Sequence, residues 1–199
     1  DVSFDIKSGE TVCVVGESGS GKSVSSLSLM RLVEFGGGEI TDGRLLFSRK
    51  DADEVDLAQT KPKLMRSIRG NEIGMIFQEP MTALNPVFTV ERQLTEGLRL
   101  HKGLSKAEAS AKALNLMREV RIPEPERRMK QYPHELSGGM RQRVVIAMAL
   151  ACEPRLLIAD EPTTALDVTI QAEILALMDR LKRDTGTAVM FITQDMAVI

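Results

Sequence analysis

The residues with the clearest chemistry form a glycine- and serine-rich run, Gly16-Glu17-Ser18-Gly19-Ser20-Gly21-Lys22-Ser23. Glycines allow the backbone to curl so that successive N–H groups point toward a polyphosphate. The Lys22 ammonium could then reach the terminal phosphates, and the Ser23 hydroxyl could bind Mg²⁺. The run lies between the apolar segment 11–15 and the helix-like segment 24–32. This order of strand, loop and helix N-terminus predicts a phosphate-binding loop rather than a chance match.

Two adjacent carboxylates follow the apolar segment 156–159. In a parallel sheet this segment would place Asp160 at the carboxyl edge, where ligands bind. Asp160 could hold the water shell of Mg²⁺ opposite Ser23, and Glu161 could accept a proton from an attacking water molecule. The alternative is an inert, solvated Asp-Glu pair, which the phosphate loop elsewhere in the chain disfavours.

A second glycine-containing run, Leu136-Ser137-Gly138-Gly139-Met140-Arg141-Gln142-Arg143, precedes an apolar helical pattern. Ser137 is a preferred N-cap residue, and Gly138 and Gly139 leave backbone N–H groups uncovered at the positive end of a helix. Glycine costs about 1 kcal/mol at a helical position, so a plain helix start would not need two. We therefore expect a second phosphate-binding site at Ser137, Gly138 and Gly139.

Short apolar runs and helical patterns alternate along the chain. The expected strands are residues 2–6, 11–15, 44–47, 73–77, 156–159 and 188–193. The last three are nearly continuous apolar runs, which is typical of central strands in a parallel sheet. Helices are expected over 24–32, after the capping box Ser105–Glu108 and over 169–183, whereas the charged segment 48–69 is expected to be a solvated loop with a short helix. The distribution predicts an α/β core interrupted by a helical subdomain.

The bulk composition excludes some classes of protein. A chain of 199 residues suits one domain. The 26 Lys and Arg residues nearly balance 28 Asp and Glu residues, so no large basic surface for nucleic acid is indicated. No apolar run approaches membrane-spanning length, and residues 1–10 lack the apolar core of a signal peptide. Cys13 and Cys152 lie in apolar surroundings without metal-ligand spacing, so both are expected to be buried free thiols.

These motifs together resemble a known family. The phosphate loop, the run 136–143 and the segment 156–162 occur in the order of the nucleotide-binding domain of ATP-binding-cassette (ABC) proteins. Gln78, in Phe77-Gln78-Glu79-Pro80, is similar to the family's Q-loop. Asp167, in Ala165-Leu166-Asp167, is similar to its D-loop. The resemblance covers essentially the whole chain.

Further stretches are similar to one branch of the family. Residues 75–86 and 132–136 look like the oligopeptide and dipeptide importers, and the insertion 48–69 is similar to that of glutathione-import ATPases. The resemblance implies an α/β P-loop NTPase (RecA-like) core with a mainly parallel sheet. It also implies an inserted α-helical subdomain and an N-terminal antiparallel β portion.

The resemblance implies a single nucleotide-binding domain over residues 1–199, truncated at both ends. Residues 1–78 and 153–199 would form the ATP-binding core, and residues 79–152 the helical subdomain with the signature run. The implied cofactors are ATP, bound by Gly16–Ser23, and Mg²⁺.

Roles for individual residues follow from the same resemblance. Glu161 would be the catalytic base, and Lys22 would bind the terminal phosphates. Ser23, Gln78 and Asp160 would bind the metal ion, and Gln78 would also sense the attacking water. In the family two cassettes dimerise head to tail, so that Ser137, Gly138, Gly139 and Asp167 of one cassette face the ATP of the other.

One position departs from the family pattern. Phe191-Ile192-Thr193-Gln194-Asp195 matches the switch segment, but the family usually has histidine where Gln194 stands. A glutamine amide can donate a hydrogen bond to a γ-phosphate oxygen but cannot carry a charge. With glutamine at position 194, we therefore expect ATP binding and closure of the dimer to be retained while hydrolysis is slowed.

The resemblance implies an ATPase that energises an ABC importer for dipeptides, oligopeptides or glutathione. Its partners would be a second nucleotide-binding domain, membrane permease subunits and, indirectly, an extracytoplasmic solute-binding protein, with no nucleic acid. Its location would be the cytoplasmic face of the cell membrane. Two alternatives remain open: a cassette with impaired hydrolysis that acts as a regulatory switch, and a soluble ABC ATPase without a transport role. An exporter is disfavoured because no fused membrane domain is visible.

Overall fold

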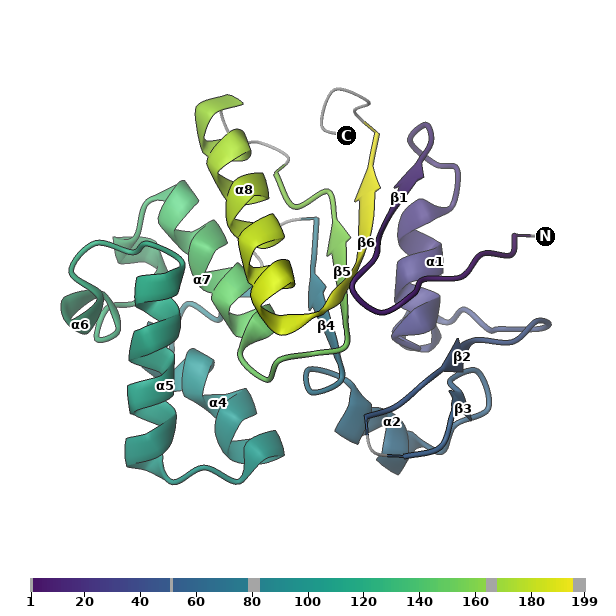
Figure 1. Cartoon of the computed structure of the whole chain (residues 1–199), viewed down its shortest axis with the longest axis horizontal. Coiled ribbons are helices and arrows are strands. Elements are labelled where there is room, and N and C mark those ends of the chain that lie inside the picture. The colour runs from purple at the N-terminus through teal and green to yellow at the C-terminus, as the bar shows by residue number, and fades with distance from the viewer. Residues whose placement is uncertain (1, 51, 79–82, 164–167, 195–199) are drawn as a thin grey trace.

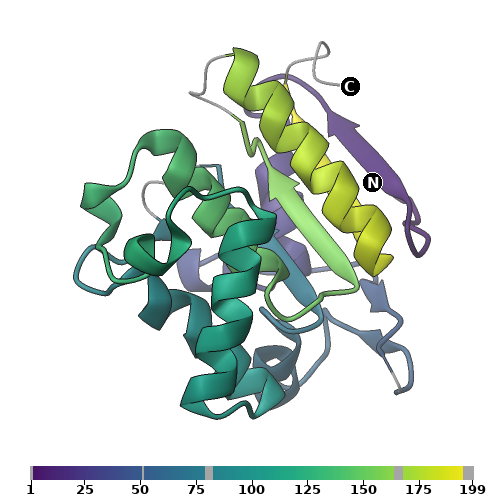
Figure 2. The same ribbon diagram turned by 60° about the vertical axis from the view of Figure 1, so that its left-hand side comes forward.

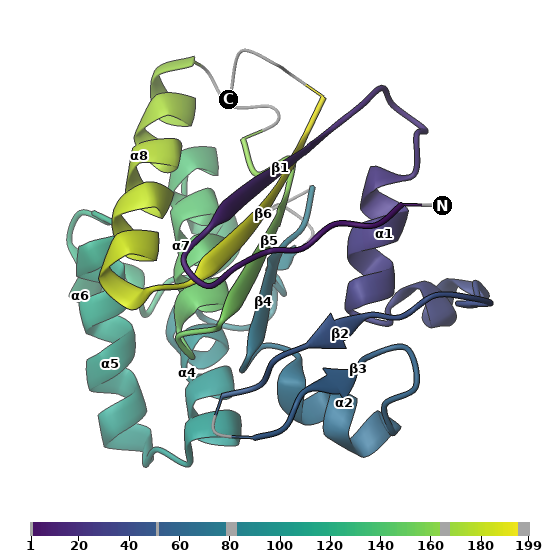
Figure 3. The same ribbon diagram turned by 45° about the vertical axis from the view of Figure 1, so that its right-hand side comes forward.

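A central sheet of four parallel strands organises the molecule. A computed structural model describes residues 2–50, 52–78, 83–163 and 168–194. The sheet has the order β1 (Thr11–Val15), β6 (Ala188–Thr193), β5 (Leu156–Asp160) and β4 (Ile73–Ile76). All three strand pairings are parallel, with Val12 opposite Met190 and Ile158 opposite Met190 and Met75. The strands therefore end at a common edge of the sheet (Figure 3).

Helices cover both faces of this sheet. Helix α1 (Lys22–Leu29) lies on one side, and α7 (Gly138–Leu150) and α8 (Val168–Thr185) lie on the other (Figure 1). Successive side chains of a strand point to opposite faces. Strands β5 and β6 are buried at every residue because both faces are covered. Ile158 packs in the cluster that contains Met30, whereas Leu157 packs in the cluster that contains Ile174.

The remaining elements form two groups. A two-stranded antiparallel sheet, β2 (Leu46–Phe47) and β3 (Val55–Asp56), leads into α2 (Pro62–Ile68) beneath α1. On the side away from β1, the teal helices gather as a separate layer (Figure 2). They are α4 (Val90–Lys102), α5 (Lys106–Glu119) and the short α6 (Pro125–Arg128). Two 3₁₀ turns, η1 (Val33–Gly36) and η2 (Pro133–Glu135), complete the described elements.

Several predicted elements are confirmed. Strands β1 and β6 have the expected bounds, and β5 and α8 extend the expected segments by one or a few residues. Ser105 accepts from the Glu108 N–H while the Glu108 carboxylate accepts from the Ser105 N–H, so the capping box is present. Helix α1 is shorter than expected and ends at Leu29.

Three expectations are wrong. Residues 2–6 form no strand, and Val2 is 85% exposed. Within the described residues, no strand pairs with this alternating segment. The expected strand 44–47 is reduced to two residues. Strand β4 lies at the edge of the described sheet rather than in its centre. Its residues are nonetheless mostly buried because helices, not another strand, cover them.

Two further corrections concern smaller features. Segment 48–69 contains the expected short helix, α2, but the rest of it is not simply a solvated loop: it also contains β3, and Leu57, Met65 and Ile68 are at most 1% exposed. Cys152 is buried, but Cys13 is exposed, because β1 is an edge strand. Both cysteines are free thiols. Among the described residues, no helix is both long and apolar enough to cross a membrane.

Candidate functional site

The loop between β1 and α1 has the backbone geometry that a phosphate-binding loop needs. Gly19 has φ +82° and Gly21 has φ +92°, a left-handed conformation that other residues rarely adopt. A Cβ atom at Gly16 would lie 2.8 Å from the Ser20 Oγ. Glycine is therefore favoured at Gly19 and Gly21 by backbone conformation, whereas a side chain at Gly16 would require the Ser20 hydroxyl to move. Helix α1 begins directly after Gly21.

Lys22 is held at the mouth of this loop. Its Nζ donates to the carbonyl oxygens of Gly16, at 2.6 Å, and Glu17, at 2.8 Å. The residue is only 9% exposed. These two hydrogen bonds hold the ammonium group against the backbone of the loop. Glu17, Ser18 and Ser20 are exposed along the same loop.

Asp160 lies beside the first turn of α1. The Ser23 Oγ donates to the Asp160 Oδ1 at 3.2 Å, and the Ser26 Oγ donates to the Oδ2 at 3.4 Å. Asp160 is 3% exposed. Burial raises the pKa of its carboxyl group, while the two serine hydroxyls and Lys22 oppose that rise and the Glu161 charge adds to it. A dehydrated carboxylate beside a hydroxyl is a donor set that suits a hard cation such as Mg²⁺.

Glu161 occupies the next position, at the end of β5. Its N–H donates to the Ile192 carbonyl of β6 at 2.9 Å, and its carboxylate accepts a hydrogen bond from the Gln78 Nε2 at 3.0 Å. Glu161 is 8% exposed and has φ +46°. The ends of β4, β5 and β6 thus place Gln78, Asp160 and Glu161 together, as the parallel arrangement predicts.

Other predicted residues lie elsewhere. Ser137 caps α7 by accepting from the Met140 N–H at 3.3 Å, and Gly138 and Gly139 form the first turn of this helix. In the described part of the chain, no hydrogen bond or ion pair joins Ser137–Gly139 to the phosphate loop. Gln194 follows β6 and is exposed. Asp167 lies outside the described residues.

Ser26 was not anticipated as a member of the site. It is fully buried, and its hydroxyl is shared between the Ser23 carbonyl, at 2.8 Å, and Asp160. The spacing of three residues from Ser23 would have indicated it, because residues at i and i+3 share a helix face.

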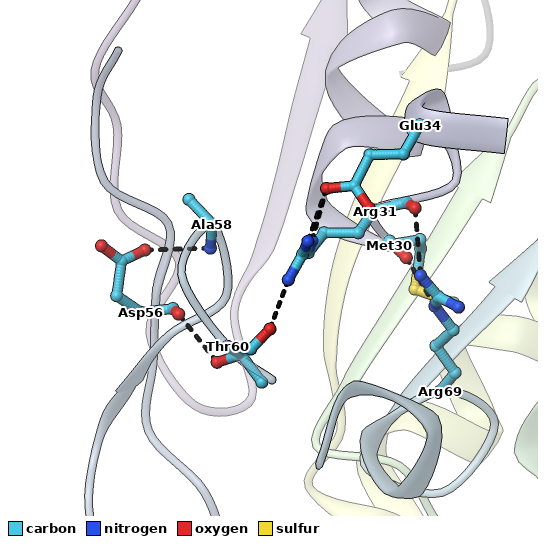
Figure 4. Close-up of polar contacts among 7 residues, drawn as sticks. All are labelled: Met30, Arg31, Glu34, Asp56, Ala58, Thr60 and Arg69. Atoms are coloured by element: carbon cyan, nitrogen blue, oxygen red, sulfur yellow. Dashed lines mark hydrogen bonds and ion pairs between the residues drawn. The ribbon is translucent and has the colours of Figure 1, made fainter. Parts of the chain in front are cut away.

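Two arginines at the other end of α1 were also not anticipated (Figure 4). Arg69 donates to the carbonyl oxygens of Met30, at 2.6 Å, and Arg31, at 3.0 Å. Arg31 pairs with Glu34 and also donates to the Thr60 carbonyl. These bonds join the carboxyl end of the phosphate-loop helix to segment 48–69. No sequence pattern indicates them, because they connect residues distant in the chain.

The nearby groups do not form a dedicated metal cage. Among the described residues, no cluster of three or more His, Cys, Asp or Glu side chains could hold a metal ion. Magnesium ions in nucleotide sites need only one or two protein ligands, because phosphates and waters supply the rest. Ser23, Asp160 and Gln78 are the residues that could provide these ligands.

Comparison with known proteins agrees with this geometry. Residues 1–164 match the model of the family described as ABC transporter. The glutathione import ATP-binding protein GsiA of Pectobacterium atrosepticum is 56% identical over 100% of this chain and 32% of that protein. The putative peptide import ATP-binding protein BMEII0863 of Brucella melitensis is also 56% identical, over 100% of this chain and 59% of that protein. The chain therefore spans about a third of the GsiA relative and somewhat more than half of the Brucella one.

A solved structure has the same fold. It is described as a dimeric structure of a post-hydrolysis state of the ATP-binding cassette MJ0796 bound to ADP and Pi. It is 30% identical and matches with a TM-score of 0.84 over 100% of this chain and 80% of that one. The expected fold, an α/β P-loop NTPase with a parallel core and a small antiparallel sheet, is thus confirmed. Together with the family match over most of its length, this establishes that the chain belongs to the ABC transporter family.

Proposed function

We propose that this chain binds and hydrolyses ATP and energises an ABC importer of dipeptides, oligopeptides or glutathione. One observation carries the proposal: Lys22, the Ser23–Asp160 pair and the Gln78–Glu161 pair meet at the carboxyl edge of the sheet. The substrate class is supported by identities of 53–56% to proteins named as glutathione or peptide import ATP-binding proteins.

The residues divide the work of hydrolysis among them. The backbone of Gly16–Ser23 and the Lys22 ammonium bind the β- and γ-phosphates, replacing the two carbonyl partners that Lys22 has now. Ser23, Asp160 and Gln78 hold Mg²⁺, which supplies neutralisation of the phosphate charge. Glu161 accepts a proton from the attacking water molecule, and the Gln78 amide orients its carboxylate.

Gln194 sets the rate of this reaction rather than the affinity. It lies exposed at the end of β6, one residue beyond Thr193. Its neutral amide donates to a γ-phosphate oxygen. It carries no positive charge that could stabilise the negative charge that develops on the γ-phosphate in the transition state. We expect binding of ATP to be retained and turnover to be low.

The proposed assembly is a head-to-tail pair of cassettes. Ser137, Gly138, Gly139 and Asp167 of one cassette face the triphosphate held by the other. The first turn of α7 supports this role, because the N–H groups of Gly138 and Gly139 lie at the positive end of the helix while the Ser137 hydroxyl caps the Met140 N–H. The partners are membrane permease subunits and, through them, an extracytoplasmic solute-binding protein. Nucleic acid is not among the partners, since the net charge is −2, and the working location is the cytoplasmic face of the membrane.

Steady-state and single-turnover ATPase assays test the proposal on the purified protein that contains this chain in full. Glu161→Gln should reduce turnover at least about 100-fold while ATP still binds, because only the proton acceptor is lost. Lys22→Ala should abolish ATP binding in a calorimetric titration. The matched control Glu96→Gln removes an exposed carboxylate of α4 and should change neither. Absence of any heat with Mg-ATP for the wild type would overturn the proposal.

A further inference from the structure

The backbone at Glu161 adopts a conformation that its sequence disfavours. Its φ of +46° is left-handed, a region costly for a residue with a Cβ. The next residue is Pro162, whose ring restricts the preceding residue to extended conformations. Such strain persists only where surrounding contacts hold it, so the contacts around this turn require an explanation.

Several described segments contact the turn. At Glu161, the backbone N–H donates to the Ile192 carbonyl of β6, and the Gln78 amide donates to the carboxylate. At the next residue, the Gln142 Nε2 of α7 donates to the Pro162 carbonyl. Gln142 is 0% exposed and Pro162 is buried, so no water competes for this hydrogen bond. The amide of Gln142 thus fixes the residue that directly follows the base.

The other half of the Gln142 side chain contributes nothing to stability. Its Oε1 is buried and, within the part of the chain that the structure describes, makes no hydrogen bond. A buried, unsatisfied oxygen is unfavourable compared with an apolar group of the same shape. A residue selected only for packing in α7 would be apolar, as Val144, Val145 and Ile146 are. The donor group of Gln142 therefore has a purpose other than filling the core.

Gln142 also connects two sites. It lies on the same helix as the Ser137 cap, about 7.5 Å along the helix axis at roughly 1.5 Å per residue. A rigid helix transmits any displacement of its first turn to a side chain one turn further on. Engagement of the Ser137 loop by a phosphate would therefore reach the Pro162 carbonyl through a single side chain.

We infer that Gln142 is a positioning residue that holds the strained Glu161–Pro162 turn and so orients Glu161, linking the Ser137 loop to the base of the same chain. The inference rests on the proposed function, since it assigns Gln142 an effect on the base rather than on the nucleotide.

Kinetics of two isosteric variants test the inference on the purified protein that contains the full chain. Gln142→Met keeps the side-chain length and removes both the donor and the unpaired oxygen, so the fold should survive. We expect kcat for ATP hydrolysis to fall about tenfold or more while the KM and the Kd for Mg-ATP change less than about twofold. A merely structural role would change binding and turnover together.

Gln142→Glu gives a second readout. A carboxylic acid at this buried position can donate to the Pro162 carbonyl only when protonated, and burial favours the protonated form. Relative to wild type at each pH, the kcat of Gln142→Glu should rise as pH is lowered from about 8 to 6. The kcat of Gln142→Met should show no such rise, because methionine does not titrate.

Gln93→Met is the matched control. Gln93 is also a buried glutamine on a helix, 8% exposed, and donates to the loop carbonyls of Asn85 and Phe88. It does not touch the Glu161 turn, so its replacement should lower thermal stability but leave kcat within about twofold. Wild-type kcat in Gln142→Met, or equal losses in both variants, would overturn the inference. An inactive wild type would instead refute the proposed function.

Discussion

Asp160 shows how one residue balances folding against ligand binding. It is almost fully buried, and its two oxygens are held by the hydroxyls of Ser23 and Ser26. Burial raises the pKa of the carboxyl group, because the charged form loses its hydration. A divalent cation bound to the carboxylate would instead favour the charged form. The carboxylate therefore opposes stability of the unliganded chain and favours the metal-bound one.

The sign of this effect predicts a pH dependence. Because the pKa is raised on folding, the folded chain binds the Asp160 proton more tightly than the unfolded chain. Stability from this group is greatest below the unfolded pKa and is lost as pH rises through the folded pKa. Asp160→Asn should therefore increase the free energy of unfolding of the nucleotide-free protein at pH 8, measured by urea titration. The difference from wild type should shrink toward acid pH.

Asp53→Asn is the control for Asp160→Asn, since Asp53 is exposed and its replacement should leave stability unchanged at both pH values. A destabilised Asp160→Asn at pH 8 would contradict the role given to burial. The same variant should lose the Mg²⁺ dependence of ATP binding.

The neutral side chain of Gln194 is expected to limit the turnover number. Gln194→His restores a side chain that can become charged near neutral pH. We expect turnover to rise about tenfold with an unchanged Kd for ATP, because the added charge acts on the transition state and not on the ground state. Steady-state ATPase assays across pH 6 to 8 measure this. An unchanged kcat would show that Gln194 does not limit the reaction.

Among the elements, α1 depends most on contacts outside itself. The helix has only eight residues, so it has little stability of its own. Gly21 leads into it at one end, and the Arg69 guanidinium binds the Met30 and Arg31 carbonyls at the other (Figure 4). Arg31 has φ +49° and is itself tied to Glu34 and Thr60. Segment 48–69 is thus a support for the phosphate-loop helix.

Arg69→Met tests this support. The variant removes two charge-assisted hydrogen bonds and the cation at the helix carboxyl end, so the free energy of unfolding should fall by about 1–2 kcal/mol. The affinity for ATP should weaken as well, because α1 carries Lys22 and Ser23. Chemical denaturation and nucleotide titration measure the two effects. Arg66→Met, at an exposed position of helix α2, which ends just before Arg69, should change neither.

At the scale of the whole molecule, the two helix ends proposed to bind phosphate lie on different elements. One is at Gly21 before α1 and the other at Ser137 before α7. Hydrogen bonds within the described residues do not connect them. If two copies complete each other's sites, dimerisation must depend on ATP and must be lost when hydrolysis removes the γ-phosphate.

Light scattering on the Glu161→Gln variant tests this dependence. Mg-ATP should convert the protein to a dimer, because the triphosphate persists when its base is missing. Adding Gly138→Asp should abolish the dimer by placing a negative charge at the second anion site. A Cβ at Gly138 meets no atom within 4 Å, so the effect is electrostatic, and Gly138→Ala should still dimerise. A monomer with Glu161→Gln alone would contradict the head-to-tail assembly.

The sequence by itself determined the features that depend on residues close together in the chain. The phosphate loop, the capping box at Ser105, the cap at Ser137 and the buried strands β5 and β6 follow from residue types at short spacing. Local hydrogen bonds and side-chain periodicity decide these features within one or two turns. Residues 2–6 show the limit of such rules: their alternation predicted a strand, but no strand in the described part of the chain pairs with them.

Only the tertiary structure decided the contacts between distant segments. Which elements pack together decides three features: the hydrogen bond from Arg69 to the Met30 carbonyl, the hydrogen bond from Gln142 to the Pro162 carbonyl, and the left-handed backbone of Glu161. The edge position of β4 and the exposure of Cys13 depend on strand order in the same way. The hydrogen bonds of Gln142 to Pro162 and of Arg69 to Met30 join residues 20 and 39 positions apart. No spacing rule covers such separations, because their geometry is set by packing of the whole chain rather than by the local backbone.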